Sequence, residues 1–148
     1  MNTVKPSKNL NLPPSPKKRF FINIVSYFPA VLTASWLGTY LDLYFSGKGM
    51  YEFPLRPFAE IFSINLAFTL FALPFFTGLF LFLMSKMIPW YRGVFVLLLS
   101  IGGAAAEKTA EQWGFFRHSD QWHHSYSFFG YLLFLIIIWH VFTWTNRR

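Results

Sequence analysis

One stretch of the sequence gathers most of the side chains that can transfer protons or bind metals. Glu107 and Glu111 are four residues apart, so they share one face if this segment is helical. Carboxylate and imidazole are ligands that zinc, manganese and iron accept, which makes a divalent metal site chemically conceivable. The spacing lacks the two histidines on one helical face that a zinc-binding helix requires. The candidate polar cluster comprises Glu107, Glu111, His118, Asp120, His123 and His124.

The same residues also have plainer interpretations. Glu111 is three residues from Lys108, a spacing at which the two side chains pair along a helix. His118, His123 and His124 suit a solvated loop close to lipid headgroups. On the sequence alone we expect no cofactor, and a divalent metal at this cluster is the alternative.

Glu107 is the strongest single candidate because it directly follows thirteen apolar residues, 94–106. A charged carboxylate at mid-bilayer costs about 3 kcal/mol, and less near the interface. Glu107 is therefore expected to be protonated, paired or facing a polar cavity. If the helix leaves the membrane early, Glu107 is instead hydrated.

The composition indicates a protein whose solvent is lipid. Of 148 residues, 54% are hydrophobic and 13% are charged, whereas an average soluble domain has about 25% charged residues. Aromatic residues make up 22% of the chain, more than one core of this size can bury. The absence of cysteine excludes disulfides, thiolate zinc sites, iron–sulfur clusters and cysteine nucleophiles.

Four apolar segments predict an all-α integral membrane bundle. The expected spans are residues 20–45, 61–84, 94–112 and 125–144 of a transmembrane domain at 20–148, preceded by a disordered basic cytoplasmic tail at 1–19. The third span is the least obvious. Its uncharged run rises only about 20 Å, too little for a ~30 Å hydrocarbon core, so the helix must continue through Glu107 to Gln112. Pro74 removes one hydrogen bond from the second span, and neighbouring helices must cover that defect.

The distribution of charge predicts the orientation. Nine basic residues flank the spans on the side of the two termini, four lie on the other side, and all six acidic residues are on that other side. Basic residues are retained in the cytoplasm, so we expect both termini there, in a multi-pass plasma-membrane protein. Orientation explains the net charge of +7 better than nucleic-acid binding does. On the external side, Arg56 is expected to close the first loop by a salt bridge with Asp42 or Glu60.

Small residues in the third span predict close contact between helices. Gly102, Ala106 and Ala110 recur every fourth residue, a spacing that lets two backbones approach each other in lipid. This stripe predicts a homo-oligomer or a complex with another membrane protein.

From Leu41 to its C-terminus, the chain resembles a family of small multi-pass membrane proteins of bacilli, clostridia and related spore-forming bacteria. The resemblance rests on Glu52-Phe53-Pro54-Leu55-Arg56, on the Phe-rich stretch from Ser63 to Pro74, on Glu107, and on Trp122 through Ser127. The Phe-rich helix here lacks the acidic residue that family members can carry, and His123 stands where a Lys often follows Trp. The resemblance implies membrane location and a compact helical bundle, and it implies no particular activity.

Three functions are consistent with these features. The leading prediction is an integral plasma-membrane protein of structural, accessory or sensory type that acts through helix–helix association and has no enzymatic activity. The first alternative is a metal-assisted hydrolase or transferase with an external Glu/His/Asp site. The second is an ion or proton transporter subunit that uses Glu107 and Asp42.

Overall fold

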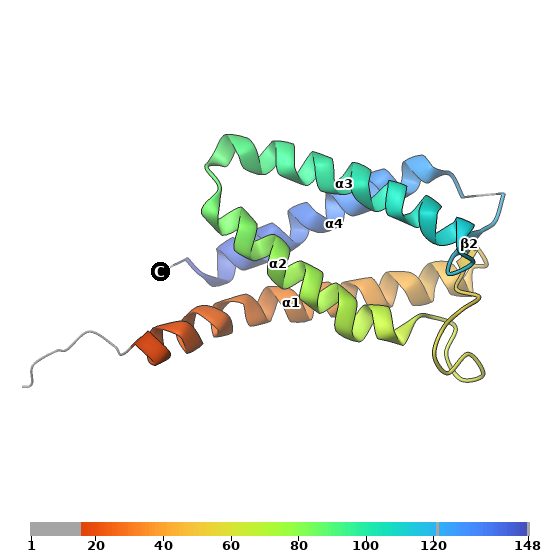
Figure 1. Ribbon diagram of the computed structural model, residues 1–148, viewed down its shortest axis with the longest axis horizontal. Coiled ribbons are helices and arrows are strands. Elements are labelled where there is room, and N and C mark those ends of the chain that lie inside the picture. Colours follow the sequence, from red (N-terminus) through yellow and green to blue (C-terminus); the bar gives the residue numbers. More distant parts are fainter. Residues whose placement is uncertain (1–15, 121, 148) are drawn as a thin grey trace, which may run out of the picture.

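Four long helices make up most of the chain, as Figure 1 shows for the computed structural model. It describes residues 16–120 and 122–147, and for residues 16–23 and His124 it describes the backbone alone. The helices are α1 (Pro16–Gly47), α2 (Leu73–Lys86), α3 (Pro89–Gln112) and α4 (His124–Thr145), with a π-helix η1 (Phe68–Ala72) before α2 and two short strands, β1 (Tyr51–Glu52) and β2 (Arg117–His118). The predicted all-α bundle is confirmed.

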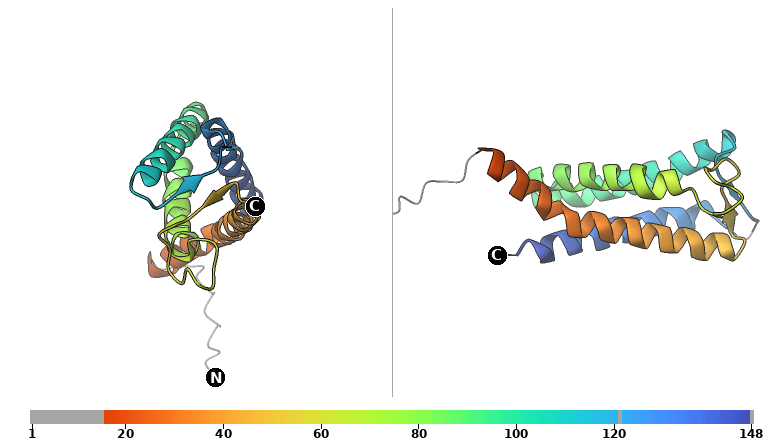
Figure 2. Two further views of the ribbon diagram at one scale, coloured as in Figure 1. Left: turned by 90° about the vertical axis from the view of Figure 1, so that its right-hand side faces the viewer. Right: turned by 90° about the horizontal axis from the view of Figure 1, so that it is seen from below.

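The bundle has two different ends (Figures 1 and 2). At the end we call the loop end, the α1–η1 and α3–α4 connections meet, and β1 pairs with β2 across the ends of the helices. At the opposite end, the turn end, α2 passes into α3 through Met87 and Ile88, close to where α1 begins and α4 finishes. The described ends of the chain therefore lie at the same end of the bundle, as an even number of spans requires.

The helix surfaces are apolar on the outside. Four helical segments are long and apolar enough to cross a membrane, namely Ile24–Gly47, Phe68–Lys86, Pro89–Gln112 and Ser125–Thr145. Large side chains point away from the bundle in each of them; Trp36 and Phe71, for example, are 70% and 75% exposed. In water such surfaces would aggregate. These features indicate a multi-pass membrane protein.

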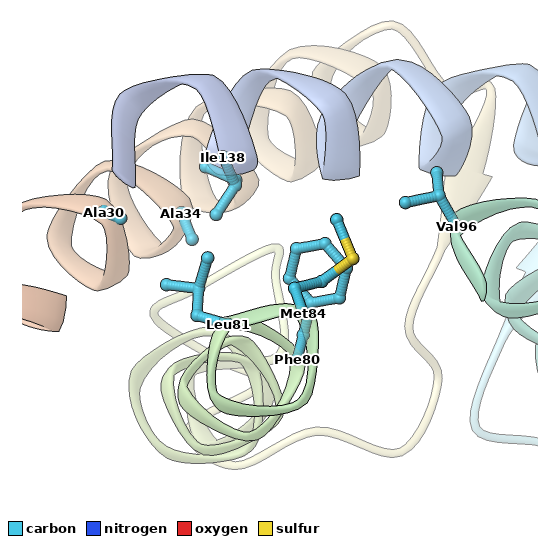
Figure 3. Packing of buried hydrophobic residues seen from close by; sticks show 7 residues of the cluster. All are labelled: Ala30, Ala34, Phe80, Leu81, Met84, Val96 and Ile138. Atoms are coloured by element: carbon cyan, nitrogen blue, oxygen red, sulfur yellow. The ribbon is translucent and has the colours of Figure 1, made fainter. Parts of the chain in front are cut away.

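The core between the helices is narrow and built from small and medium side chains. Figure 3 shows Ala30 and Ala34 of α1 facing Leu81 of α2 and Ile138 of α4. The two alanines let α1 approach its neighbours closely, and all four side chains are fully buried. Because lipid is as apolar as this core, its contribution to stability comes from close packing more than from removal of apolar surface from water.

The predicted continuation of the third span is confirmed, since α3 runs unbroken past Glu107 to Gln112. It begins at Pro89, five residues before the predicted start, because proline suits the first turn of a helix. Gly114 ends it: this residue has φ +77°, and the N–H of Phe115 reaches back to the carbonyl of Ala110. This is the glycine-terminated helix end that satisfies the last carbonyls.

The other helix boundaries differ more from the sequence prediction. The helix of the second span begins at Leu66 instead of residue 61, and Pro74 is the second residue after the π-helix. A π turn widens the backbone where the proline ring would clash with the preceding turn, and α1 packs against the same part of the helix, with Gly38 beside Leu73. Helix α1 begins at Pro16, inside the segment predicted as tail; residues 1–15 lie outside the described residues.

Candidate functional site

The pairing of the two connections organises the loop end. Tyr51 lies opposite His118 and Glu52 opposite Arg117 in the β1–β2 register. The Arg117 guanidinium contacts the Glu52 carboxylate at 3.1 Å, and both side chains are mostly exposed. Opposite charges facing each other across a strand pair stabilise its register modestly. This pairing places Tyr51 over the ends of the helices.

Glu107 is the centre of a partly buried hydrogen-bond network between α3 and α4. The Ser127 hydroxyl donates to one carboxyl oxygen of Glu107, and the Tyr131 hydroxyl lies 3.4 Å from the other. The indole N–H of Trp122 donates to the Ser127 oxygen at 3.0 Å. Ser127 and Trp122 are both buried. Glu107 therefore faces α4 and not lipid, which meets the expectation that a carboxyl group at this depth is held by polar partners.

A second carboxyl group, from α1, lies in the same region. Asp42 accepts a hydrogen bond of 2.9 Å from the Tyr51 hydroxyl, and Asp42 and Glu107 are near enough for their charges to interact. Burial raises the pKa of the Tyr51 phenol far above its ordinary value, with the Asp42 carboxylate as the next largest cause. Tyr51 therefore stays protonated and remains the donor to Asp42.

We call these residues the loop-end cluster: Asp42, Tyr51, Glu107, Trp122, Ser127 and Tyr131. An aromatic layer shields it from the loop side. The Trp122 ring lies 5.1 Å from that of Phe45 and 5.3 Å from that of Tyr51, and the Phe116 ring lies 5.2 Å from Tyr51. Packed rings exclude water, which strengthens the hydrogen bonds beneath them.

A polar cleft of about 410 Å³ opens on the loop side of this aromatic layer. Tyr51 forms part of its wall, together with Arg117 and His118. Ser119, another wall residue, has a buried hydroxyl that makes no hydrogen bond within the described part of the chain. Since the Tyr51 phenol donates to Asp42, one side chain connects the cleft to the loop-end cluster.

The candidate polar cluster of the sequence analysis divides into parts. His118 Nδ1 lies 2.6 Å from a carboxyl oxygen of Glu111, so Glu111 pairs with His118 and not with Lys108. Asp120 and His123 are exposed, and the His123 ring rests against Tyr126. The backbone of His124 begins α4, and its side chain lies outside the described residues. Over the described residues, no three His, Asp or Glu side chains come together as a metal site would require.

Arg56 does not form the predicted salt bridge with Asp42 or Glu60. Its guanidinium instead donates to three backbone carbonyls of its own loop, those of Phe53, Ala59 and Phe62. The planar guanidinium has enough donors to satisfy all three acceptors at once. Asp42 is occupied by Tyr51 and Glu60 is exposed, so the loop is closed by bonds to its backbone.

A close contact of α3 with α4 is made at Gly103, one residue away from the predicted stripe. A Cβ atom added at Gly103 would lie 2.9 Å from Cδ2 of Tyr131, whereas one added at Gly102 would meet nothing within 4 Å. Gly102 and Ala106 are exposed, and Ala110 packs beside the aromatic layer. Gly103 thus lets the Tyr131 ring lie against α3, with its hydroxyl reaching Glu107 one turn further along.

Sequence reasoning had missed four members of the cluster: Tyr51, Trp122, Ser127 and Tyr131. A signal for two of them exists, because Ser127 and Tyr131 are four residues apart and therefore share a helical face. Gly103 likewise lies four residues before Glu107.

Comparison of the chain with protein-family models, with curated proteins and with solved structures gives no match.

Proposed function

We propose that this chain is a plasma-membrane protein of the accessory or sensory type whose working site is the loop-end cluster, where a proton is exchanged with the external solution. The observation that carries the proposal is the meeting of Asp42 from α1 and Glu107 from α3, each hydrogen-bonded by a phenol. Carboxyl groups within a membrane span are rare and commonly mark sites that bind protons or ions.

The distribution of ionisable residues favours sensing over transport. The apolar stretches 24–41, 73–85, 94–106 and 128–139 contain no Asp, Glu, Lys, Arg or His. A proton that reaches the cluster from the cleft therefore meets no further carboxylate or imidazole until His140, close to the turn end. Proton relays need a chain of such groups. The cluster is suited to binding a proton from one side.

Protonation of Asp42 or Glu107 would change hydrogen bonds that hold the loop end together. Glu107 connects α3 to α4 through Ser127 and Tyr131, and Asp42 connects α1 to β1 through Tyr51. A change in the charge of either carboxyl group alters the hydrogen bonds that hold these elements. The basic residues around both termini favour a cytoplasmic turn end, which turns the loop end toward the outside.

Infrared difference spectroscopy of the protein in lipid nanodiscs, titrated with acid, tests the proposal. We expect a carboxylic-acid band that titrates in wild type and that is lost or shifted in Glu107→Gln and in Asp42→Asn. Glu60→Gln is the matched control, because Glu60 is an exposed carboxylate of the same end. Identical difference spectra for wild type, Glu107→Gln and Asp42→Asn would contradict the proposal.

A second proposal concerns association through α3. Gly103 faces the Tyr131 ring of the same chain, while Gly102 and Ala106 lie on the outer surface of the helix, where a second helix can approach. Cross-linking in mild detergent is expected to give oligomers that Gly102→Leu with Ala106→Leu abolishes. Leu at Gly78, another open glycine, is the control. Oligomers unchanged by the double substitution would refute this contact.

A further inference from the structure

A groove at the turn end, separate from the loop-end cluster, contains a cationic side chain. It has a volume of about 470 Å³. Its walls come from the last turn of α2, the first two turns of α3 and the facing part of α4: Met84, Pro89, Arg92, Gly93, Val96, Leu132, Ile136 and Trp139. The groove exists because α3 packs against α4 and separates from α2 beyond their short turn (Figure 1).

Arg92 is fixed at one end of this groove. Its Nε donates to the carbonyl oxygens of Met84 and Met87, at 3.2 and 3.0 Å. Its guanidinium carbon lies 4.9 Å from the centre of the Trp139 ring. Within the described residues both side-chain hydrogen bonds of Arg92 are made by Nε, so its two terminal nitrogens keep their donors for another acceptor. Paired terminal donors of this kind match the oxygens of a phosphate.

The rest of the groove is apolar and extends away from Arg92 along α4. From Trp139 to Leu132 it follows seven residues of helix, which is about 10 Å. Gly93 keeps it open, because nothing lies within 4 Å of the position that a Cβ would take there. Such a surface suits a hydrocarbon chain, and Arg92 at its end suits a phosphate group on the same molecule.

We propose that this groove holds one anionic phospholipid of the surrounding bilayer, with an acyl chain against Val96 and Ile136 and the phosphate at Arg92. A basic residue between helices at the membrane surface is a recognised way to bind acidic headgroups. The bound lipid would fill the groove that α3, α4 and the last turn of α2 leave open.

Native mass spectrometry, after purification from vesicles of equal parts phosphatidylglycerol and phosphatidylcholine, tests this proposal. We expect one phosphatidylglycerol retained per wild-type chain, at least severalfold in excess of phosphatidylcholine. Arg92→Gln should abolish that preference, and Gly93→Leu should lower retention of both lipids while leaving the charge in place. Lys86→Gln is the control, because Lys86 is a cation of the same end that is exposed and does not line the groove.

Several outcomes would overturn the proposal. The first is equal retention of the two lipids by the wild-type protein. The second is a wild-type mass that corresponds to a dimer without bound lipid. The third is a loss of preference in Lys86→Gln as large as that in Arg92→Gln. If Arg92→Gln fails to fold because the Met84 and Met87 carbonyls lose their donor, two separate variants decide: Arg92→Lys should keep the preference for phosphatidylglycerol, and Gly93→Leu should lower retention of both lipids.

Discussion

At the loop end, the hydrogen bonds of Glu107 to Ser127 and Tyr131 join α3 to α4, and the hydrogen bond of Asp42 to Tyr51 joins α1 to β1. Towards the turn end, α1 and α4 meet α2 through apolar contacts, and α3 departs from α2 around a groove. In lipid, hydrogen bonds between helices have no competing water, whereas apolar contacts gain only packing. The loop end is therefore specified by particular polar atoms, and the turn end by the fit of apolar side chains.

Removing the central carboxyl group is the strongest test of this difference. Glu107→Ala leaves the hydroxyls of Ser127 and Tyr131 without their acceptor, which we expect to cost about 3 kcal/mol of unfolding free energy. Glu107→Gln keeps an acceptor oxygen and should cost roughly a third of that. Unfolding titrations in mixed micelles measure both, with Glu60→Ala as the control; equal stability of wild type and Glu107→Ala would remove the distinction between the two ends.

The packed interior nearer the turn end should respond to volume. Ile138 of α4 is fully buried against α1 and α2, whereas its neighbour Ile137 is 36% exposed. We expect Ile138→Ala to cost about 2 kcal/mol through the cavity it leaves, and Ile137→Ala to cost clearly less. The same unfolding titration measures this pair, and equal losses would show that shape does not specify this region.

The two adjacent glycines of α3 sharpen the comparison further. Gly102→Ala is expected to leave stability unchanged or raise it by up to about 1 kcal/mol, because alanine favours helix and the site is open. Gly103→Ala should instead lower stability by about 1 kcal/mol, since its Cβ meets the Tyr131 ring. Thermal unfolding in detergent compares them, and the opposite order of midpoints would contradict the packing of Tyr131 on α3.

The smallest effect is expected at the surface of the loop end. Glu52 and Arg117 form an ion pair whose side chains are 58% and 70% exposed, and such pairs contribute about 0.5 kcal/mol or less. Glu52→Gln should therefore shift the unfolding midpoint hardly at all in salt. If Glu52→Gln lowered the free energy of unfolding as much as Glu107→Ala does, the strand pair and not the loop-end cluster would be the main source of stability at this end.

The fold could be predicted from the sequence because lipid imposes few solutions. A run of thirteen apolar residues is too short to cross, so α3 had to continue past Glu107. The partners of Glu107 could not be foreseen in the same way, because Tyr131 reaches it only where Gly103 lets two helices approach. Asp42 was expected to pair with a charge nearby in its loop, yet the register of β1 with β2 gives it Tyr51. The resemblance to the family of spore-forming bacteria stays a prediction.

We propose that the bundle presents its loop end to the outside and its turn end to the cytoplasm. The chain has no cysteine, so single cysteines at Glu60 and at Ser85, both exposed and at opposite ends, can be labelled in intact cells with a membrane-impermeant maleimide. We predict that Glu60→Cys is labelled at once and that Ser85→Cys is labelled only after the cells are permeabilised. Labelling of both positions from the outside, or of Ser85→Cys alone, would contradict the account.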